Sequence, residues 1–541
     1  MAKISVLDCT LRDGGYVNNW NFGKKQKVEI IKSLLRSKID IVECGYLDIS
    51  ATSDANSTRF RTVQEFEELI ATITSEFNNQ LFLMLDYTPS LNIEDIPHIN
   101  ETKGYLKGLR MTFHRKHYKN AIVFASGLID KGYEVCIQPM VTASYKDKEL
   151  LALISLVNEL KVYAFYIVDS FGTMDNKDVE RIFHLVNYNL KSTIPLGFHS
   201  HNNKQLAFSN SVKFLSLTAE RDSIIDASVY GMGRGAGNLN TEIMTEYLNK
   251  TLKNQYLIEP LLQIIDNVLK TIKDEKEWGY SIEYFISASK NCHPNYSSFL
   301  MNKKTLNVES IAKILDDIPL EERGSFNKKL IESLYYSNLV KAEGSSTINK
   351  EIFKGKDILL IASGSSVIEK QSEIISFKKE HKNALLIGLN HVPSVEVDYY
   401  FFSNQKRYDA NVENLELDKT IVTTNIVGSS RFIIDNSEIF EKQKVKNDNV
   451  MAVMLQYFIN IGIEEVKLAG LDGYNNEGNL YSYDEYDRIL DIEVMKRQNE
   501  LMLNFLYEIK DNINIQFFTE SMFETVKRKR VSGVIPARYK S

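Results

Sequence analysis

Short apolar runs alternate with longer amphipathic stretches through the first 275 residues, and this alternation constrains the fold more than any other feature of the chain. Helical patterns cover, for example, Lys24–Ser37, Thr62–Glu76 and Lys148–Leu160. Eight strands are predicted between such stretches, at Ile4–Leu7, Ile39–Cys44, Leu81–Leu85, Gly108–Met111, Glu134–Gln138, Ala164–Val168, Ile194–Phe198 and Ile225–Val229. Eight strand–helix units in about 250 residues are typical of a (β/α)8 barrel, the TIM-barrel fold. The alternative, a doubly wound open sheet, would need an unusually high number of strands.

Composition limits the function classes. A chain of 541 residues is expected to form two or three domains, and 43% hydrophobic with 25% charged residues is typical of a globular protein. The net charge of −6 argues against a nucleic-acid partner. No apolar run reaches the ~18 residues of a membrane span, and the N-terminus shows no signal-peptide pattern. Four scattered cysteines, Cys9, Cys44, Cys136 and Cys292, indicate free thiols and a cytoplasmic location.

Polar side chains follow the predicted strands. In a barrel the carboxyl ends of all strands face one mouth, where the active site of such proteins lies. The polar residues in question are Arg12, Asp13, Glu43, Asp86, Arg110, Gln138, Asp169, His199, His201 and Tyr230. We expect Glu43, Arg110 and Asp169 either to bind substrate at this mouth or to serve as structural hydrogen-bond anchors.

A metal site is predicted where Asp13, His199 and His201 meet. The two histidines are two residues apart, so both side chains leave the same face of a strand. Their strand and that of Asp13 are both odd-numbered, and alternate barrel strands share a layer of inward side chains. One carboxylate and two imidazoles suit Mn²⁺, Mg²⁺, Co²⁺ or Zn²⁺. Arg12, next to the carboxylate, suits a developing oxyanion, so the pattern indicates carbon–carbon bond chemistry beside a carbonyl.

Five motifs carry a family resemblance. LDCTLRDGG, VECGY, DSFGTMD, GFHSHNN and YGMGRGAGN, in this order, resemble the DRE-TIM metallolyases over roughly residues 1–300. That family includes 4-hydroxy-2-oxovalerate aldolase, hydroxymethylglutaryl-CoA lyase and the isopropylmalate and citramalate synthases. The resemblance implies that Asp13, His199 and His201 bind the metal and that Arg12 stabilises an enolate. It makes Asn238 a candidate further ligand; the alternative is a loop whose glycines serve its conformation only.

The chain departs from the family pattern at the proton-transfer residue. The aldolases have a histidine three residues after the metal aspartate, and the synthases and lyases tend to have glutamine; this chain has Tyr16. A tyrosine can transfer a proton if the metal and Arg12 lower its pKa. His293 and a metal-bound water are alternative bases. The Gly-rich GMGRGAGN loop also lacks the lyases' catalytic cysteine, which argues against a hydroxymethylglutaryl-CoA lyase.

A second α/β region follows the barrel (1–275). Residues 276–345 are predicted to be a helical extension over the barrel mouth, with a boundary near Gly344–Thr347. From 350 to 526 the segments ILLIASGSS, ALLIGLN, VDYYFFSN, TIVTTN, VKLAGLDGY and INIQFF predict strands of a Rossmann-like open sheet, with a helix over Asn449–Ile461. This region resembles bacterial sialyltransferase-like and 6-hydroxymethylpterin-pyrophosphokinase-like proteins.

The strand-to-helix turn ASGSS is a candidate phosphate site. Small residues there let backbone N–H groups approach a phosphate, although simple helix capping by serine is an alternative. The resemblance places Ser363, Gly364, Ser365, Asn390 and Asn404 around a nucleotide or nucleotide sugar. The other alternative is an interaction domain without catalysis.

The last residues, 527–541, point to a longer polypeptide. Lys527–Arg530 is predicted to be a solvated linker, and the following VSGVIPARYKS resembles the opening of CMP-sugar synthetases. Together with the barrel, this predicts a pyruvate aldolase that makes or cleaves a 4-hydroxy-2-oxo acid, such as a 3-deoxy-2-ulosonic acid of a bacterial surface polysaccharide. The alternatives are a Claisen synthase that uses acetyl-CoA and a nucleotide-sensing scaffold. The resemblance also implies a homo-oligomer.

Overall fold

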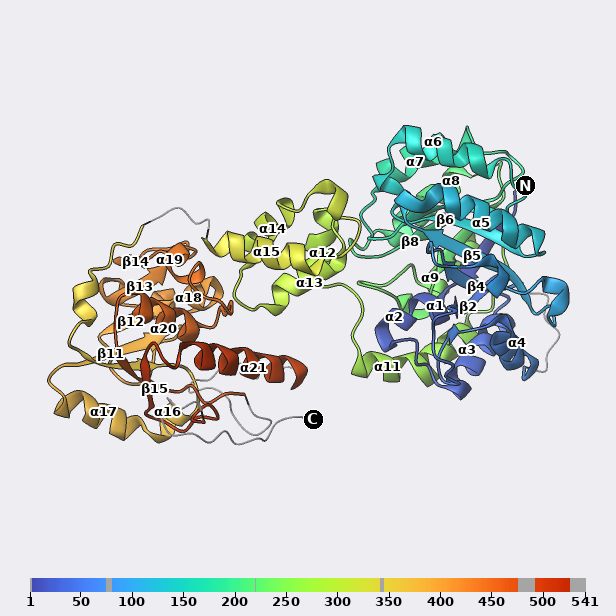
Figure 1. The fold of residues 1–541 in the computed structure, drawn as a ribbon. Helices are drawn as coiled ribbons and strands as arrows, with labels where there is room; N and C mark the ends of the chain where they lie inside the picture. The colour runs from blue at the N-terminus through green and yellow to red at the C-terminus, as the bar shows by residue number, and fades with distance from the viewer. Residues whose placement is uncertain (1, 74–79, 219, 341–344, 475–491, 526–541) are drawn as a thin grey trace. The chain divides into compact units, whose positions relative to one another are not determined.

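The computed structural model describes residues 2–73, 80–218, 220–340, 345–474 and 492–525. The chain forms two compact units, coloured mainly blue to green and yellow to red in Figure 1. The first unit comprises Met1–Ser298 and Pro319–Phe326, and the second comprises Phe299–Ile318 and Asn327–Ser541. Each unit has its own parallel sheet.

The first unit is the expected barrel. Its strands run in the order β1-β9-β8-β7-β6-β5-β4-β2, every neighbouring pair is parallel, and β1 also pairs with β2, which closes the sheet. The strands are β1 Ile4–Asp8, β2 Ile41–Leu47, β4 Gln80–Asp86, β5 Leu106–Phe113, β6 Glu134–Pro139, β7 Ala164–Asp169, β8 Leu196–Ser200 and β9 Ser223–Ala227. The predicted barrel is therefore confirmed, and one addition, β3 Arg59–Phe60, pairs with β2. A strand of two residues is too short to show the alternation of apolar and polar residues that predicts a strand.

Helices surround the barrel strands (Figure 1). Side chains alternate along each strand, so Val6 and Val42 join the large apolar cluster that includes the helices, whereas Leu7 and Ile41 join a smaller cluster with Phe82, Cys136 and Tyr166. The helices are α3 Lys24–Arg36, α4 Val63–Ala71, α5 Tyr118–Asp130, α6 Asp147–Val157, α7 Asn176–Asn187, α8 Ala207–Leu217, α9 Thr241–Leu252, α10 Glu259–Ile264 and α11 Lys270–Glu275. The helix predicted to reach Glu76 ends at Ala71; residues 74–79 lie outside the described residues. All four cysteines are buried and free.

The helical segment after the barrel divides between the two units, which differs from the single extension predicted for 276–345. Its helices are α12 Ile282–Ser289, α13 Pro294–Asn302, α14 Val308–Asp316 and α15 Lys328–Val340. The part that belongs to the first unit contacts the loops after β7 and β9, since the His293 ring packs on Phe171 and Trp278 Nε1 donates to the Tyr230 carbonyl. α14 and α15 belong to the second unit.

The second unit is an open parallel sheet in the order β14-β13-β12-β11-β10-β15-β16. The strands are β10 Asp357–Ile361, β11 Ala384–Leu389, β12 Tyr399–Phe402, β13 Thr420–Thr423, β14 Phe432–Ile434, β15 Glu465–Ala469 and β16 Asn514–Phe517. The helices are α16 Ser366–Glu369, α17 Gln371–Glu380, α18 Gln405–Asn411, α19 Asn436–Phe440, α20 Val450–Asn460 and α21 Ile492–Ile509. Six of these strands were predicted and three-residue β14 was not. The order reverses between β10 and β15, so the crevice at their carboxyl ends is a topological switch point.

Within the described ranges, no helix is long and apolar enough to cross a membrane. The sequence segment Lys527–Arg530 and the terminal VSGVIPARYKS lie outside the described residues.

Candidate metal centre and neighbouring sites

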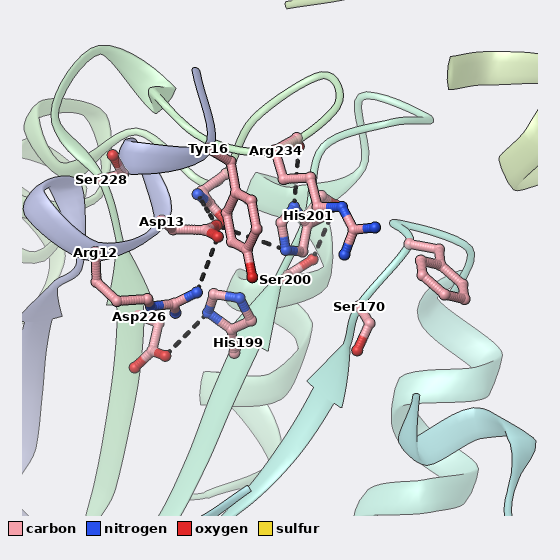
Figure 2. A network of polar contacts seen from close by, with 12 residues as sticks. Arg12, Asp13, Tyr16, Ser170, His199, Ser200, His201, Asp226, Ser228 and Arg234 are labelled. Carbon is pink, nitrogen blue, oxygen red and sulfur yellow. Dashed lines mark hydrogen bonds and ion pairs between the residues drawn. The ribbon is translucent and has the colours of Figure 1, made fainter. Parts of the chain in front are cut away.

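Asp13, His199 and His201 meet at the carboxyl end of the barrel strands. Asp13 ends the short helix α1 Thr10–Asp13 that follows β1, and the two histidines lie in and directly after β8. One ligand atom from each of the three residues lies within 4.8 Å of the other two, and Asp13 Oδ2 is 3.6 Å from His201 Nε2. All three side chains are buried. Figure 2 shows Asp13 from the short helix pointing toward the two histidines at the end of β8.

The outer nitrogen of each histidine already has a partner. His199 Nδ1 lies 3.0 Å from Asp226 Oδ2, and His201 Nδ1 lies 3.2 Å from the carbonyl oxygen of Arg234. Both partners are acceptors, so each Nδ1 carries the proton and donates it. The Nε2 lone pairs are therefore left for a cation, as is usual for metal-bound histidines.

Burial and neighbouring charges shift the pKa values of Asp13 and His201. Burial opposes ionisation of Asp13, but the charge of Arg12, with His201 and His199, outweighs it and holds the carboxyl pKa below its usual range. Burial lowers the pKa of His201 to about 4, although Asp13 acts in the opposite direction. One carboxylate and two imidazoles thus fit a divalent cation of the kind that nitrogen and oxygen ligands bind.

Arg12 is held rigidly beside Asp13. Its Nε donates to Glu43 Oε2 at 2.7 Å, and its Nη1 donates to Asp13 Oδ1 at 2.8 Å. Burial disfavours the guanidinium, but Glu43 and Asp13 raise the Arg12 pKa well above its usual value. The remaining nitrogen, Nη2, is buried and has no hydrogen-bond partner in the protein. A buried donor without a partner is costly, and a substrate oxygen would satisfy it.

Glu43 and Arg110 lie inside the barrel rather than at an open surface. Both side chains are fully buried, and Arg110 Nη1 is 2.7 Å from Glu43 Oε2. Arg110 also pairs with Asp226 and packs on the Tyr166 ring at 4.9 Å. The result is a continuous chain of charges from Arg12 through Glu43, Arg110 and Asp226 to His199. Glu43 and Arg110 therefore contact the residues that hold the centre.

Asn238 closes the centre from the Gly-rich loop after β9. Its Nδ2 donates to Asp13 Oδ2 at 2.5 Å and to the Met232 carbonyl at 3.2 Å, while its Oδ1 is buried without a partner. Gly233 makes this approach possible, because a Cβ there would lie 2.1 Å from Asn238 Nδ2 and 3.1 Å from Asp13 Oδ2. The unpartnered amide oxygen is compatible with a further ligand role for Asn238.

Tyr16 belongs to the short helix α2 Gly15–Asn18 and reaches over the centre (Figure 2). Tyr16 is 41% exposed. Its hydroxyl lies 3.1 Å from the hydroxyl of Tyr46, and the ring packs edge-on against Trp20. The guanidinium of Arg234 covers the ring at 5.4 Å.

His293, the alternative base, lies next to Arg234. Its Nε2 contacts Arg234 Nη2, and its Nδ1 accepts from the backbone N–H of Asn295 at 3.1 Å. Burial and the Arg234 charge lower the pKa of His293 to about 3. His293 is thus a neutral, buried ring attached to the Gly-rich loop.

Asp169 stabilises the turn after β7. Its carboxylate accepts from the backbone N–H groups of Thr173 at 2.8 Å and Met174 at 3.2 Å. Burial raises its pKa to about 6, although these hydrogen bonds act in the opposite direction. Among the described residues, the hydrogen-bond partners of its carboxylate all belong to this turn, which is the structural role that the sequence left open.

The second unit contains a cavity of about 450 Å³ at the carboxyl ends of β10, β11, β12 and β15. Of the predicted nucleotide-binding residues, Ser363, Gly364, Asn390 and Asn404 line this cavity and Ser365 does not. Cationic, acidic and amide side chains also line it, among them Lys304, Arg407, Asp448, Asp472, Asn449 and Asn499.

The ASGSS turn itself is closed by Asp472. Gly364 N–H donates to the Gly470 carbonyl at 2.9 Å, and Ser366 N–H donates to Asp472 Oδ2 at 2.9 Å. Ser365 and Ser366 hydroxyls also donate to this carboxylate. Asp472 thus occupies the position at the start of α16 where the sequence predicts a phosphate. A ligand would instead contact side chains farther into the cavity.

Sequence reasoning missed three residues of these sites. Asp226 is a charged residue within the apolar strand IIDA, which is a usable signal. Arg234 is the one cation in the GMGRGAGN loop. Asp472 follows the strand that ends at Ala469, and its contact with α16 joins residues 106 positions apart, so only the fold reveals it.

Comparison with known proteins finds relatives of the barrel. Residues 98–268 match the family model described as HMGL-like. The chain is 26% identical over 245 residues to an oxaloacetate decarboxylase of Mycobacterium tuberculosis, covering 45% of this chain and 70% of that protein. It is 28% identical over 255 residues to a 4-hydroxy-2-oxovalerate aldolase of Carboxydothermus hydrogenoformans, covering 46% of this chain and 71% of that protein. A solved structure, the N-terminal domain of an aldolase candidate from Bacteroides vulgatus, is 27% identical with a TM-score of 0.46. The match covers 57% of this chain and 99% of that structure's chain.

The residues that match the family model and the Asp–His–His centre both belong to the first unit. The first unit of this chain therefore contains an HMGL-like domain of the DRE-TIM metallolyases.

Proposed function

We propose that the barrel is a metal-dependent pyruvate aldolase that forms or cleaves a 4-hydroxy-2-oxo acid. The observation that carries this proposal is the buried, unpartnered Nη2 of Arg12 beside the Asp13–His199–His201 group. A fixed donor in a water-poor site is suited to an oxygen that becomes negatively charged during the reaction. The curated relatives named 4-hydroxy-2-oxovalerate aldolase support the choice of substrate class.

Asp13, His199 and His201 would hold the divalent cation, with Asn238 Oδ1 as a further ligand. A cation bound there supplies Lewis-acid polarisation of the 2-oxo group of pyruvate. Mn²⁺ and Mg²⁺ are the ions we favour, with Co²⁺ and Zn²⁺ as alternatives.

The chain's own groups orient the substrate and move the proton. Arg12 Nη2 donates to the 2-oxo oxygen, and its position is fixed because Glu43 and Asp13 hold the other two nitrogens. We assign the proton transfer to the Tyr16 hydroxyl, because His293 Nε2 already faces Arg234 and Tyr16 is open to the mouth. A proton passes from the methyl group of pyruvate to the Tyr16 oxygen, the methyl carbon then bonds to the aldehyde carbon, and the alkoxide formed from the aldehyde oxygen takes the proton back from Tyr16.

Pyruvate enolisation tests the proposal without knowledge of the aldehyde. The full chain with Mn²⁺ in D₂O is expected to exchange the methyl protons of pyruvate, followed by NMR, and Asp13→Ala is expected to abolish the exchange. Asp147→Ala is the matched control, since Asp147 is exposed and pairs with Arg181 on the barrel surface. Absence of exchange in the unmodified chain refutes the proposal.

Two other outcomes would assign a different activity. Thiol release from acetyl-CoA without pyruvate exchange would indicate a Claisen synthase. Exchange with release of CO₂ from oxaloacetate, and no cleavage of any 4-hydroxy-2-oxo acid, would indicate a decarboxylase. A 3-deoxy-2-ulosonic acid for a surface polysaccharide is the product we favour, on the resemblance of VSGVIPARYKS alone.

We also propose that the second unit binds a nucleotide or nucleotide sugar. Its cavity lies at the switch point of an open parallel sheet, where ligands of such sheets bind, and Lys304 and Arg407 could contact phosphate. Calorimetric titration of the full chain with CTP and with a CMP-sugar is expected to show binding that Lys304→Met weakens about tenfold. Lys313→Met, an exposed lysine paired with Glu309, is the control. No binding of either probe favours an interaction domain.

A further inference from the structure

Arg234 differs from the other two arginines of the site in having no acidic partner. Arg12 is paired with Asp13 and Glu43, and Arg110 is paired with Glu43 and Asp226. Among the described residues, Arg234 makes no ion pair; its guanidinium contacts the Tyr16 ring and His293 Nε2. The side chain is half-buried, so its charge is neither neutralised by a carboxylate nor fully solvated.

The nitrogen that Arg234 contacts is a donor. The backbone N–H of Asn295 donates to His293 Nδ1 at 3.1 Å, and this bond places the ring proton of the neutral imidazole on Nε2. Nε2–H of His293 and the N–H groups of Arg234 therefore face each other, and neither accepts from the other. Phe171, Tyr296 and Phe326 pack around the His293 ring, which is 7% exposed, so Nε2–H cannot turn to solvent.

A pair of adjacent donors is satisfied by an acceptor that lies beside them, within reach of both. A guanidinium together with a fixed N–H group suits a carboxylate or a phosphate, because charge-assisted bonds to these groups are strong. A neutral hydroxyl would leave the Arg234 charge without a counterion. The chemistry shared by both candidates is a compact oxyanion.

The donor pair adjoins the metal centre. The Arg234 carbonyl accepts from His201 Nδ1 at 3.2 Å, so the loop that carries the guanidinium is bonded to a metal ligand. Figure 2 shows Arg12 and Arg234 on opposite sides of the Tyr16 side chain. The proposed function assigns Arg12 to the 2-oxo oxygen of pyruvate, whereas the guanidinium of Arg234 contacts the Tyr16 ring and His293 and is left for a different group.

We propose that Arg234 and His293 form a subsite for an anionic group on the aldehyde that adds to pyruvate. This inference rests on the proposed aldolase function and narrows its second substrate to an aldehyde that carries a carboxylate or a phosphate. The anionic group keeps all its covalent bonds during the reaction. Only the methyl carbon of pyruvate and the aldehyde carbon form a bond, as described above.

Matched aldehydes test the subsite on the full chain with Mn²⁺ and pyruvate. Glyceraldehyde 3-phosphate is compared with glyceraldehyde, and succinic semialdehyde with butanal, so the two pairs separate phosphate from carboxylate. In at least one pair, kcat/KM for the anionic member is expected to exceed that for the neutral member by about 10- to 100-fold, the range for a charge-assisted contact. Arg234→Met is expected to lower this ratio about tenfold or more.

Further variants separate a lost contact from a lost fold. His293→Gln keeps an N–H donor near the same place and is expected to retain more of the ratio than His293→Leu. Lys273→Met removes a cation that packs on the rings of Tyr230 and Trp278, and its ratio is expected to equal that of the unmodified chain. A ratio near one in the unmodified chain, or an unchanged ratio in Arg234→Met, overturns the proposal.

Direct binding distinguishes failure of the subsite from failure of the aldolase function. Chelator-treated full chain is titrated with inorganic phosphate and with succinate. Arg234→Met is expected to weaken binding of one of them, whereas Lys273→Met is expected to leave that binding unchanged. Binding lost in Arg234→Met without pyruvate exchange supports the subsite and refutes the aldolase. Pyruvate exchange with binding unaffected by Arg234→Met refutes the subsite and keeps the aldolase.

Discussion

The variant Asp226→Asn tests the buried charge chain beneath the metal centre. Asp226 accepts from His199 Nδ1 at 3.0 Å and pairs with Arg110, which is fully buried. Asparagine keeps the shape of aspartate but removes the charge. It can also turn its amide toward His199, which would move the imidazole proton to Nε2 and take that nitrogen away from a cation.

The expected magnitude follows from the charges that the structure brings together. Arg12 and Arg110 contribute two positive charges, and Asp13, Glu43 and Asp226 contribute three negative ones, so these five side chains have a net charge of −1. The substitution raises this to 0 and leaves Arg110 with Glu43 alone. We expect a loss of about 3–5 kcal/mol in the free energy of unfolding, typical of breaking a buried pair. We expect metal affinity to fall about 10- to 100-fold, typical of losing a histidine's outer partner.

Two assays read these effects separately. Denaturant unfolding of the metal-free chain gives the free energy of unfolding, and Mn²⁺ titration followed by electron paramagnetic resonance gives the affinity. Asp147→Asn, an exposed aspartate, is the control. The double variant Asp226→Asn/Arg110→Met removes both partners and is expected to recover part of the lost stability. A folded Asp226→Asn protein with unchanged Mn²⁺ affinity would refute the assigned role of Asp226, and a double variant as unstable as the sum of the single variants would refute the pairing.

Three other predictions concern single contacts. Arg12→Lys keeps a charge but loses the forked nitrogens, so kcat for pyruvate exchange is expected to fall about 10²- to 10³-fold, as when an oxyanion donor is removed. Gly233→Ala places a Cβ 2.1 Å from Asn238 Nδ2 and is expected to weaken Mn²⁺ binding, whereas Gly324→Ala, with nothing within 4 Å, serves as the control in the same titration. Asp472→Ala removes the acceptor for Ser366 N–H and is expected to lower the free energy of unfolding by about 1 kcal/mol, typical of a lost helix cap and measured by denaturant unfolding. Asp418→Ala, on an exposed turn, is the control and is expected to leave the free energy of unfolding unchanged. An unchanged unfolding curve for Asp472→Ala would contradict the closed turn.

The fold was largely predictable because its signals are local. Each barrel strand is a run of apolar residues bounded by polar ones, and all eight were placed by pattern, as were six strands of the second sheet. The strands that escaped prediction, β3 and β14, have two and three residues, which is too few to show a period. The division of the helices after the barrel between two units was also missed, because amphipathic helices alone do not reveal which core they cover.

The residues of the candidate metal centre were predictable for a different reason. His199 lies in β8 and His201 directly after it, so their side-chain direction follows from the spacing, and the closure of a barrel brings them near Asp13. The roles of Arg110 and Glu43 could not be predicted in the same way. The sequence places them at strand ends, but their burial and pairing depend on which side chains fill the barrel interior.

The sequence by itself determined the order of strands, the residues that meet at the centre and the family that they resemble. Only the tertiary structure decided what surrounds that centre. The pairs Arg110–Asp226, Arg234–His293 and Ser366–Asp472 join residues 116, 59 and 106 positions apart. Periodicity reports the direction of a side chain from its own backbone, whereas the partner of a buried charge is set by loop paths and packing between distant segments.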